Sequence, residues 1–506
     1  MEFIATKWTA TAASIWIQCA TGASYTFGIY SPILKSSQGY SQSNLNTVSV
    51  FKDIGANIGI LSGLLLSACP DRPWIVILAG AVQCFFGYFM IWASVIGLVG
   101  KPSLWLMCFY MLVAAHAQTF FNTANVVTGV RNFADYSGTI VGISKGFLGL
   151  SGAILIQLYE SVCQGNPTSY ILLLALVPAL TSLLLMNLVR AHPCRDAIGA
   201  GGVKKYLNEY SAVALTVAAY LTFLIIYHNI FTVPSWLTSI TFSLMFLFIT
   251  ISPVSIAIRA HREESNKLSL ATTPVSYTAL PQDQDPHEIV DDHNLLQALA
   301  SLNFWLLFSI MFCALGSGVA TVNNISQIGE SLHYKTVEIS SLVSLWSIWN
   351  FLGRFGAGYI SDFLLHQSGV PRPILMVVTL AFMAAGYVVI ASGFQGNLYL
   401  GSIMVGIAYG SQWSLMPTIS SEIFGVTHLG TIFNTIPIAT PLGSYIFSVK
   451  VIGNMYDKAA AAGGGGRCYG TKCFFGSFLI LACVAIFGCV LAFVLFFRTR
   501  RFYSRV

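Results

Sequence analysis

Charged residues are scarce in this sequence. Only 9% of the 506 residues are Asp, Glu, Lys or Arg, whereas soluble globular proteins carry about 25%. The scarcity excludes a soluble globular fold, because too few charges are present to cover a solvated surface. Hydrophobic residues make up 55% of the chain instead, and the mean hydropathy is +0.72. This composition indicates a multi-pass integral membrane protein, with the lipid bilayer as its first partner.

Motifs for nucleotide or metal chemistry are also missing. The sequence has no G-x-x-x-x-G-K-[ST] phosphate loop, no HxxxH pair and no CxxC pair, and no Ser-His-Asp or Cys-His set can be assembled. We therefore expect no enzyme activity, no catalytic residues, no cofactor and no metal. The net charge of +6 is modest and gives no reason to expect nucleic acid as a partner.

Long apolar runs fill most of the chain, and nearly all reach the roughly 20 residues that cross a bilayer as a helix. The alternation typical of a β-barrel is absent, so we expect an all-α polytopic membrane protein. The start of the chain lacks the short apolar core of a signal peptide and is read as the first span. About fourteen spans are predicted, at 8–33, 44–69, 74–97, 103–130, 137–160, 168–189, 208–230, 234–258, 302–328, 337–361, 372–393, 397–419, 428–455 and 474–498.

Two polar stretches divide these spans. Residues 190–207 are short and basic, whereas residues 259–300 are rich in Ser, Thr, Pro and acids. The second stretch cannot bury a core and is predicted to be a disordered cytosolic loop. The predicted domains are a first six-helix half at 1–190, a linker with two extra helices at 191–258, the loop at 259–300, and a second six-helix half with a basic tail at 301–506. We expect the two extra helices to pack outside the core.

The distribution of Lys and Arg predicts the topology. If the N-terminus is cytosolic, the cytosolic side holds about 15 of these residues and the outer side about 6, with the rest in spans. An even number of spans then places the C-terminus in the cytosol as well. The sequence does not distinguish the plasma membrane from an endomembrane.

The stretch Trp349–Asp362, WNFLGRFGAGYISD, combines an arginine, three glycines and an acid inside an apolar run. An arginine at membrane depth costs roughly 3 kcal/mol on insertion scales, so Arg354 is expected to face a cavity or a partner. The glycines are expected to let neighbouring helices approach closely. Two roles stay open for Arg354, namely contact with a substrate and hydrogen bonding to the carbonyl ends of adjacent helices.

The two halves resemble each other at one position. Glycines precede Pro70-Asp71-Arg72 at the inner end of the second span, and glycines precede Asp362 at the inner end of the tenth. A duplicated six-helix unit would give this pattern. It resembles the major facilitator superfamily, in which acid and base residues at these turns latch the two halves together. The resemblance implies a cytoplasmic gate formed by Asp71, Arg72, Asp362 and Glu422.

Other motifs resemble a narrower family. WIQCATGASYTFGIYSPILK, YSQSNL, FKDIGANIGILSG and KGFLGLSGAI are similar to the plant nodulin-like proteins. DDHNLLQALASLNFWLLF, GSGVATVNNISQIGESL and SEIFG are similar to the C-terminal half of the same proteins, labelled nuclear fusion defective-like. The first-half turn, PDRP, departs from the superfamily by lacking its longer basic string.

A further resemblance concerns Arg354. The spacing of Arg354, Gly358 and Asp362 is similar to the eighth helix of monocarboxylate transporters and oxalate/formate antiporters, in which the arginine meets the substrate carboxylate. The two parallel donors of a guanidinium match a carboxylate. Amides in spans need partners, which a wet central cavity supplies, so the other predicted substrate-binding residues are Asn122, Asn125, Asn323, Asn324 and Gln327.

Four ionisable groups in the spans have two interpretations each. Asp53 is the candidate for proton coupling, because a buried carboxylate has a raised pKa and titrates near neutral pH. Lys52 lies beside it and is a second proton-coupling candidate. Because neighbouring residues point about 100° apart on a helix and cannot simply pair, the alternative is that Asp53 and Lys52 each bond a neighbouring helix. His116 is a candidate proton relay or a packing residue. Lys145 is expected to extend to the membrane surface if it is not functional.

Cys468 and Cys473 are the candidate disulfide. They flank four residues in the outer loop before the last span, on the side where oxidising conditions prevail. Cys163 is the alternative partner.

The leading hypothesis is a secondary active transporter of a small solute, an organic anion or monocarboxylate, that works by alternating access. Its transport unit is expected to be a monomer, with protons as a candidate coupling ion. The alternative is a non-transporting membrane receptor or scaffold that signals through residues 259–300.

Overall fold

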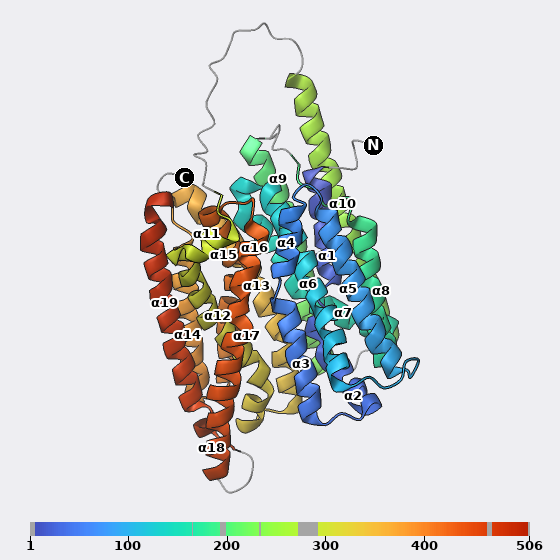
Figure 1. Cartoon of the computed structure of the whole chain (residues 1–506), viewed down its shortest axis with the longest axis vertical. Helices are drawn as coiled ribbons and strands as arrows, with labels where there is room; N and C mark the ends of the chain where they lie inside the picture. The colour runs from blue at the N-terminus through green and yellow to red at the C-terminus, as the bar shows by residue number, and fades with distance from the viewer. Residues whose placement is uncertain are drawn as a thin grey trace.

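The computed structural model of the chain describes residues 6–163, 165–192, 199–231, 234–271, 292–462 and 468–503. Within these ranges the regular elements are helices, and they run side by side as one upright bundle (Figure 1). Eleven helices in the described part are long and apolar enough to cross a membrane. The other three expected spans correspond to α1 with α2, to α13 and to α15, which are shorter or carry more polar residues.

The helices of the first half extend from the start of the described chain to Leu185. They are α1 (Lys7–Ala20), α2 (Phe27–Gln38), α3 (Gln42–Asn57), α4 (Ile60–Ala68), α5 (Pro73–Val95), α6 (Leu104–Asn132), α7 (Ser137–Val162) and α8 (Pro167–Leu185), with short 3₁₀ turns at Ala23–Thr26 and Ala134–Tyr136. The inserted pair follows as α9 (Gly199–Ile230) and α10 (Ser235–Ala271).

The helices of the second half begin at Leu295. They are α11 (Leu295–Ala300), α12 (Leu302–Ser331), α13 (Thr336–Ser368), α14 (Pro373–Ser392), α15 (Asn397–Phe424), α16 (Leu429–Thr435), α17 (Ala439–Ser444), α18 (Asn454–Ala462) and α19 (Phe475–Tyr503). A 3₁₀ turn at Ile436–Ile438 joins α16 to α17, a π-helix, η5 (Tyr445–Gly453), joins α17 to α18, and a 3₁₀ turn at Thr471–Cys473 precedes α19.

Local sequence explains where the helices begin and break. Pro73, Pro167 and Pro373 occupy first-turn positions, where a missing N–H costs nothing. The span expected at 44–69 is not continuous, because it breaks between α3 and α4 beside Gly59. The span expected at 428–455 is also broken, and Pro437 lies in the 3₁₀ turn at its first interruption.

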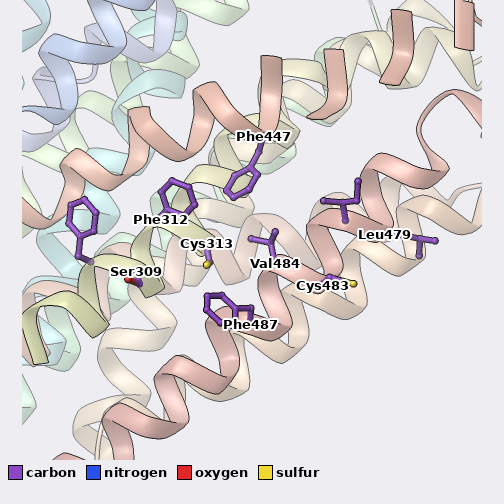
Figure 2. Close-up of a pocket in the computed structure, with 10 residues that line it drawn as sticks. Ser309, Phe312, Cys313, Phe447, Leu479, Cys483, Val484 and Phe487 are labelled. Carbon is purple, nitrogen blue, oxygen red and sulfur yellow. The ribbon is translucent and has the colours of Figure 1, made fainter. Parts of the chain in front are cut away.

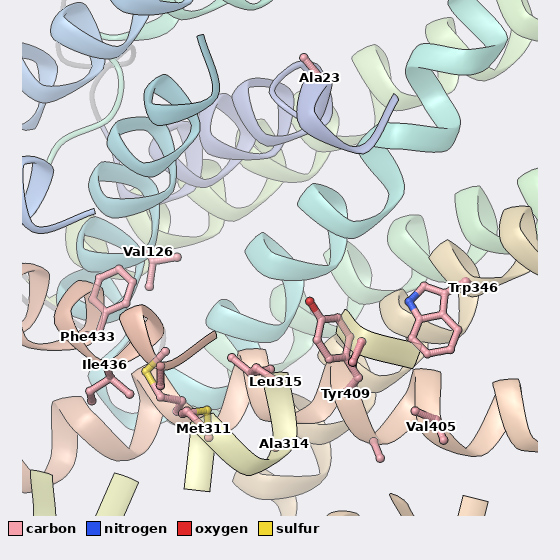
Figure 3. Close-up of a cluster of buried hydrophobic side chains, with 14 of the residues drawn as sticks. Ala23, Val126, Met311, Ala314, Leu315, Trp346, Val405, Tyr409, Phe433 and Ile436 are labelled. Carbon is pink, nitrogen blue, oxygen red and sulfur yellow. The ribbon is translucent and has the colours of Figure 1, made fainter. Parts of the chain in front are cut away.

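The most extensive contacts between the two halves are those of α7 with α13 and of α4 with α16. α7 also contacts α15, and α6 also contacts α16. Figure 3 shows the same apposition in the apolar core, where Val126 of α6 lies near Phe433 of α16. The start of α1 and the end of α19 lie at the same end of the bundle, which we call the termini end (Figure 1).

The inserted helices lie against the seam between the halves. α10 packs on α1 and α7, and α9 packs on both α7 and α13. Tyr210 of α9 anchors the pair by donating a hydrogen bond to the carbonyl of Trp8, at 3.1 Å. The pair therefore lies outside the core and contacts both halves.

The expectation of disorder throughout 259–300 is wrong at both ends of that stretch. α10 continues to Ala271, and α11 occupies Leu295–Ala300. Ion pairs hold the extension of α10, including Arg259–Glu209 at 2.7 Å and Lys205–Glu263 at 3.1 Å. Residues 272–291 lie outside the described residues.

Candidate functional site

Arg354 lies halfway along α13 and is only 2% exposed. Its Nε donates to Asn350 Oδ1 on the same helix at 2.8 Å. Its two terminal nitrogens donate to the first half: Nη1 to the carbonyl of Lys145 at 3.2 Å, and Nη2 to the hydroxyl of Tyr25 at 3.4 Å. The guanidinium thus lies between the halves, and all three of its acceptors are neutral.

Glycines bring the neighbouring helices close to this arginine. A Cβ on Gly353 would overlap the carbonyl of Ile407 on α15, and a Cβ on Gly410 would overlap the carbonyl of Asn350. The close approach predicted for Gly353 and Gly358 is found. The same expectation for Gly356 is wrong, because a Cβ there would have nothing within 4 Å.

Lys145, whose carbonyl accepts from Arg354, has a side chain that is also buried, and the residue is 2% exposed. Its Nζ is 5.2 Å from the ring centre of Trp413 on α15 and 5.5 Å from that of Phe433 on α16. The expectation that this lysine reaches the membrane surface is wrong, since it points into the second half. The Arg354 guanidinium approaches the same Trp413 ring at 5.7 Å.

Tyr25 connects the buried Arg354 to an exposed surface of the bundle. The tyrosine is 46% exposed although its hydroxyl bonds a buried guanidinium. Tyr409 of α15 is close enough to interact electrostatically with Asp53 of α3 and with Arg354. Groups from both halves therefore converge here, away from the termini end.

Asp53 and Lys52 do not behave as the sequence predicts. Lys52 Nζ pairs with Asp53 Oδ1 at 3.0 Å, so the two neighbours do meet, because the long lysine side chain bends back. The Asp53 side chain is 42% exposed, so the expected burial of this carboxylate is not found.

The termini end contains a second polar centre at Asp362. Its carboxylate accepts the backbone N–H groups of Gly138 and Thr139, at 3.1 and 2.5 Å, at the start of α7. An acid at a helix N-terminus satisfies unpaired N–H groups and complements the helix dipole. Asp362 is 3% exposed, so this contact is a buried link between the halves.

Arg372 joins Asp362 to Glu422. Its Nη1 lies 2.6 Å from Asp362 Oδ1, and its Nε lies 2.5 Å from Glu422 Oε1. Burial disfavours the charged form of Arg372, but the negative charges of Glu422 and Asp362 raise its pKa above the ordinary value. The hydroxyl of Tyr503, near the end of α19, donates to Glu422 at 2.5 Å. Glu422 thus belongs to a network within the second half.

The first-half turn is arranged differently. Asp71 and Arg72 are exposed, and neither contacts Asp362. Arg131 at the end of α6 instead crosses to the second half, donating from Nη2 to the carbonyl of Thr427 at 3.4 Å. Asp71 contributes only its charge, which acts on Arg131. The four expected gate residues therefore do not form one cluster.

The predicted amides are spread over two places, and none is among the groups that Arg354 contacts. Asn122 and Asn125 are buried in α6, where both side-chain atoms of Asn125 lack a hydrogen-bond partner in the described part of the chain. Asn324 bonds Ser448 in its own half at 2.8 Å. Asn323 is exposed and Gln327 is half-buried on the same helix, α12.

His116 has a partner within the first half. Its Nδ1 lies 2.8 Å from Gln83 Oε1, and its ring packs edge-on against Phe120. This environment fits the packing interpretation. Cys468 and Cys473 form the predicted disulfide, while Cys163 is free.

A pocket of about 570 Å³ opens between α12, η5 and α19 (Figure 2). Its walls are almost entirely apolar, with Phe312, Phe447 and Phe487 among them, and no charged side chain lines it. It therefore lacks the means to orient a polar solute, and the candidate site is the cluster around Arg354.

Sequence reasoning missed three residues of these centres. Arg372 and Arg131 were counted only as charges flanking spans, and Trp413 was not singled out. A signal was present for Arg372, which lies ten residues after Asp362 at the start of the next span. No pattern marks Arg131 or Trp413, whose roles come from helices distant in the sequence.

Comparison with solved structures defines the class of fold. The chain resembles the proton:xylose symporter XylE with a TM-score of 0.58 and 11% identity, covering 96% of this chain and 94% of that one. It resembles the transporter FucP in the outward conformation with a TM-score of 0.52 and 13% identity, over 97% and 99% of the two chains. The bundle is a major facilitator superfamily fold, and the chain is a multi-pass integral membrane protein.

The chain belongs to the nodulin-like family. The sequence profile of the family described as Nodulin-like matches residues 7–258, and that of the NFD4 C-terminal domain matches residues 287–505. Protein NUCLEAR FUSION DEFECTIVE 4 of Arabidopsis thaliana is 25% identical over 99% of this chain and 90% of its own length. "Probable transporter MCH1" of Yarrowia lipolytica is 29% identical over 34% of this chain and 38% of its own length.

Proposed function

We propose that this protein is a secondary active transporter of a small organic anion, with a monomeric transport unit that works by alternating access. The observation that carries the proposal is Arg354, a buried cation halfway along α13 that bonds both halves and has no acidic partner among the described residues. The superfamily fold and a relative whose name reads "probable transporter" support the transport class.

The contacts between the halves support a state that is closed at the termini end. Asn434 of α16 donates to Thr123 of α6 at 2.6 Å, and Asp362 caps α7. Beyond Arg354, Tyr25 is 46% exposed and the Asp53 side chain is 42% exposed. With cytosolic termini, as the positive charges predict, this is an outward-facing state in which 1–190 and 301–498 are the moving halves.

Asp53 is the candidate coupling group in this proposal. Its carboxylate pairs with Lys52 at 3.0 Å in the present state, and this pair would break if the carboxylate took up a proton during transport. Asp53→Asn should then abolish stimulation of uptake by an inward proton gradient while leaving exchange without a gradient intact. Unchanged stimulation in this variant would remove protons or Asp53 from the mechanism.

The experiment that tests the substrate class uses the purified protein in detergent and in proteoliposomes. A panel of carboxylates, amino acids and sugars is screened for thermal stabilisation, since a ligand at 100 times its Kd adds about 2.7 kcal/mol. Carboxylates should stabilise the wild type, and Arg354→Lys should lose most of this effect because lysine lacks the two-donor fork.

Arg498→Lys is the matched control, because Arg498 is exposed near the end of α19 and its one bond to the described residues is to Asn303. Equal uptake by wild type and Arg354→Lys would disprove the role of the arginine. Stabilisation by neutral solutes alone would disprove the anion class.

A further inference from the structure

Lys145 is a buried cation without a counter-charge. Among the described residues its Nζ makes no hydrogen bond and no ion pair, and its neighbours are the rings of Trp413 and Phe433. Aromatic faces attract a cation but do not neutralise it. A lysine kept for structure alone would be expected to reach a carbonyl, an acid or the membrane surface, and this side chain reaches none of them.

Arg354 repeats this situation beside the same indole. The two cations lie 5.2 and 5.7 Å from the Trp413 ring centre, so they are within about 11 Å of each other. Their charges repel, and the nearby acids are already used: Asp53 pairs with Lys52, and Asp362 pairs with Arg372. Two buried positive charges without an acidic partner are costly, so a ligand that brings negative charge to both would remove the cost.

The donors of this cluster outnumber its acceptors. A guanidinium has five N–H groups, of which Arg354 uses three, and the ammonium of Lys145 uses none of its three. The buried Nε1 of Trp413 lies beside Tyr409 and makes no hydrogen bond of good geometry within the described part of the chain. Unused donors of this kind in one place match the oxygens of an anion.

From this arrangement we infer that the site takes a small dicarboxylate, with one carboxylate on Arg354, the other on Lys145 and the chain of the solute along Trp413. The inference rests on the proposed function and narrows its substrate class. A monocarboxylate would leave one of the two cations uncompensated, whereas a dicarboxylate neutralises both. Lys145 then decides between these two classes of solute.

The test compares diacids with monoacids of equal chain length, namely malonate with propionate, succinate with butyrate, and glutarate with valerate. Thermal stabilisation gives a Kd for each probe on the wild type, Lys145→Met, Lys145→Arg and Arg354→Gln. For at least one pair the wild type should bind the diacid about 10- to 100-fold more tightly, which is the range for one charged hydrogen-bonded contact. Lys145→Met should bring this ratio close to one, and Lys145→Arg should keep most of it.

Two controls separate a ligand role from a structural one. Lys145→Met removes an uncompensated buried charge, so the ligand-free protein should melt at or above the wild-type temperature. Lys450→Met, which alters an exposed lysine on η5, should keep the wild-type diacid preference.

The outcomes also separate this inference from the proposed function. Monoacid binding that depends on Arg354, with no diacid preference or with a preference that survives in Lys145→Met, would overturn the dicarboxylate inference alone. If neither acid class binds, or if Arg354→Gln binds both as the wild type does, the proposed function fails as well.

Discussion

The two turns that close the termini end have similar sequences but different structures. In the second half, Asp362 is buried, caps α7 of the other half and pairs with Arg372. In the first half, Asp71 is exposed and contributes only a charge near Arg131. In the second half, the turn before α16 is held by Asp292, which accepts the hydroxyl of Thr427 at 2.5 Å.

The difference shows that two copies of a similar motif can stabilise the contact between the halves to different extents. Burial decides the strength of an acid at a helix N-terminus, because an exposed charge interacts through water. The second-half turn should therefore dominate the stability of this closed state, and four substitutions test that order.

The largest effect is expected for Asp362→Asn. This change leaves the buried Arg372 with Glu422 as its only acidic partner and weakens the cap of α7. Breaking a buried pair on one side costs about 3–5 kcal/mol, so the melting temperature in detergent should fall steeply. Glu422 sits in the same network, and Glu422→Gln should give a smaller fall because Asp362 still neutralises Arg372. A melting temperature unchanged by Asp362→Asn would show that the seam is held elsewhere.

The next effect is expected for Gly358→Ala. An added Cβ would overlap the carbonyl of Gly138 where α13 crosses α7, and the backbones would have to separate. Overpacking of this kind costs about 1–3 kcal/mol. Gly356→Ala lies half a turn away with nothing within 4 Å of the new methyl, so it should be neutral or stabilising by up to about 1 kcal/mol. Equal losses in the two variants would mean that helix flexibility, and not the close crossing, matters.

Much of the fold could be predicted from the sequence because hydrophobic length determines a membrane helix. The expected spans correspond to helices or broken helices at nearly the expected bounds. The helix break between α3 and α4 was not predicted. In the sequence Gly59 is an ordinary small residue, and only the structure shows that Asn434 of the other half packs against it. The helical continuation of α10 was also missed, because ion pairs such as Arg259–Glu209 depend on α9 lying alongside.

The candidate site was only partly predictable. Arg354 could be identified, because a charge in an apolar run has few explanations. Its partners could not, since the Lys145 carbonyl and the Tyr25 hydroxyl come from helices hundreds of residues away. A symmetric gate was expected because similar motifs occur in both halves of the sequence. Asp362 and Asp71 differ in burial, however, and burial depends on packing between the halves.

A smaller effect is expected for Asp292→Ala. Asp292 accepts the hydroxyl of Thr427 at 2.5 Å and its N–H at 3.4 Å, both at the exposed surface. A hydrogen bond of this kind contributes about 0.5–1.5 kcal/mol, so the melting temperature should fall by less than in Asp362→Asn. Asp135→Ala is the matched control, an exposed acid near the start of α7 in the described part of the chain. If Asp292→Ala lowered the melting temperature as much as Asp362→Asn, the contact of Asp292 with Thr427 would stabilise the structure as much as that of Asp362 with α7.

The smallest effect is expected for Asp71→Asn, and it tests the asymmetry most directly. Asp71 is exposed and acts on Arg131 only at a distance, so water and salt screen the interaction. Surface substitutions of this kind change stability by about 0.5 kcal/mol or less. Arg131→Met should lower the stability more, because Arg131 bonds the carbonyls of Pro70 and of Thr427, the latter in the second half.

If Asp71→Asn instead lowered the melting temperature as much as Asp362→Asn, the two turns would stabilise the contact between the halves equally despite their different burial. Melting of both variants at low and high salt distinguishes these outcomes, since only the exposed charge should lose its effect as salt rises.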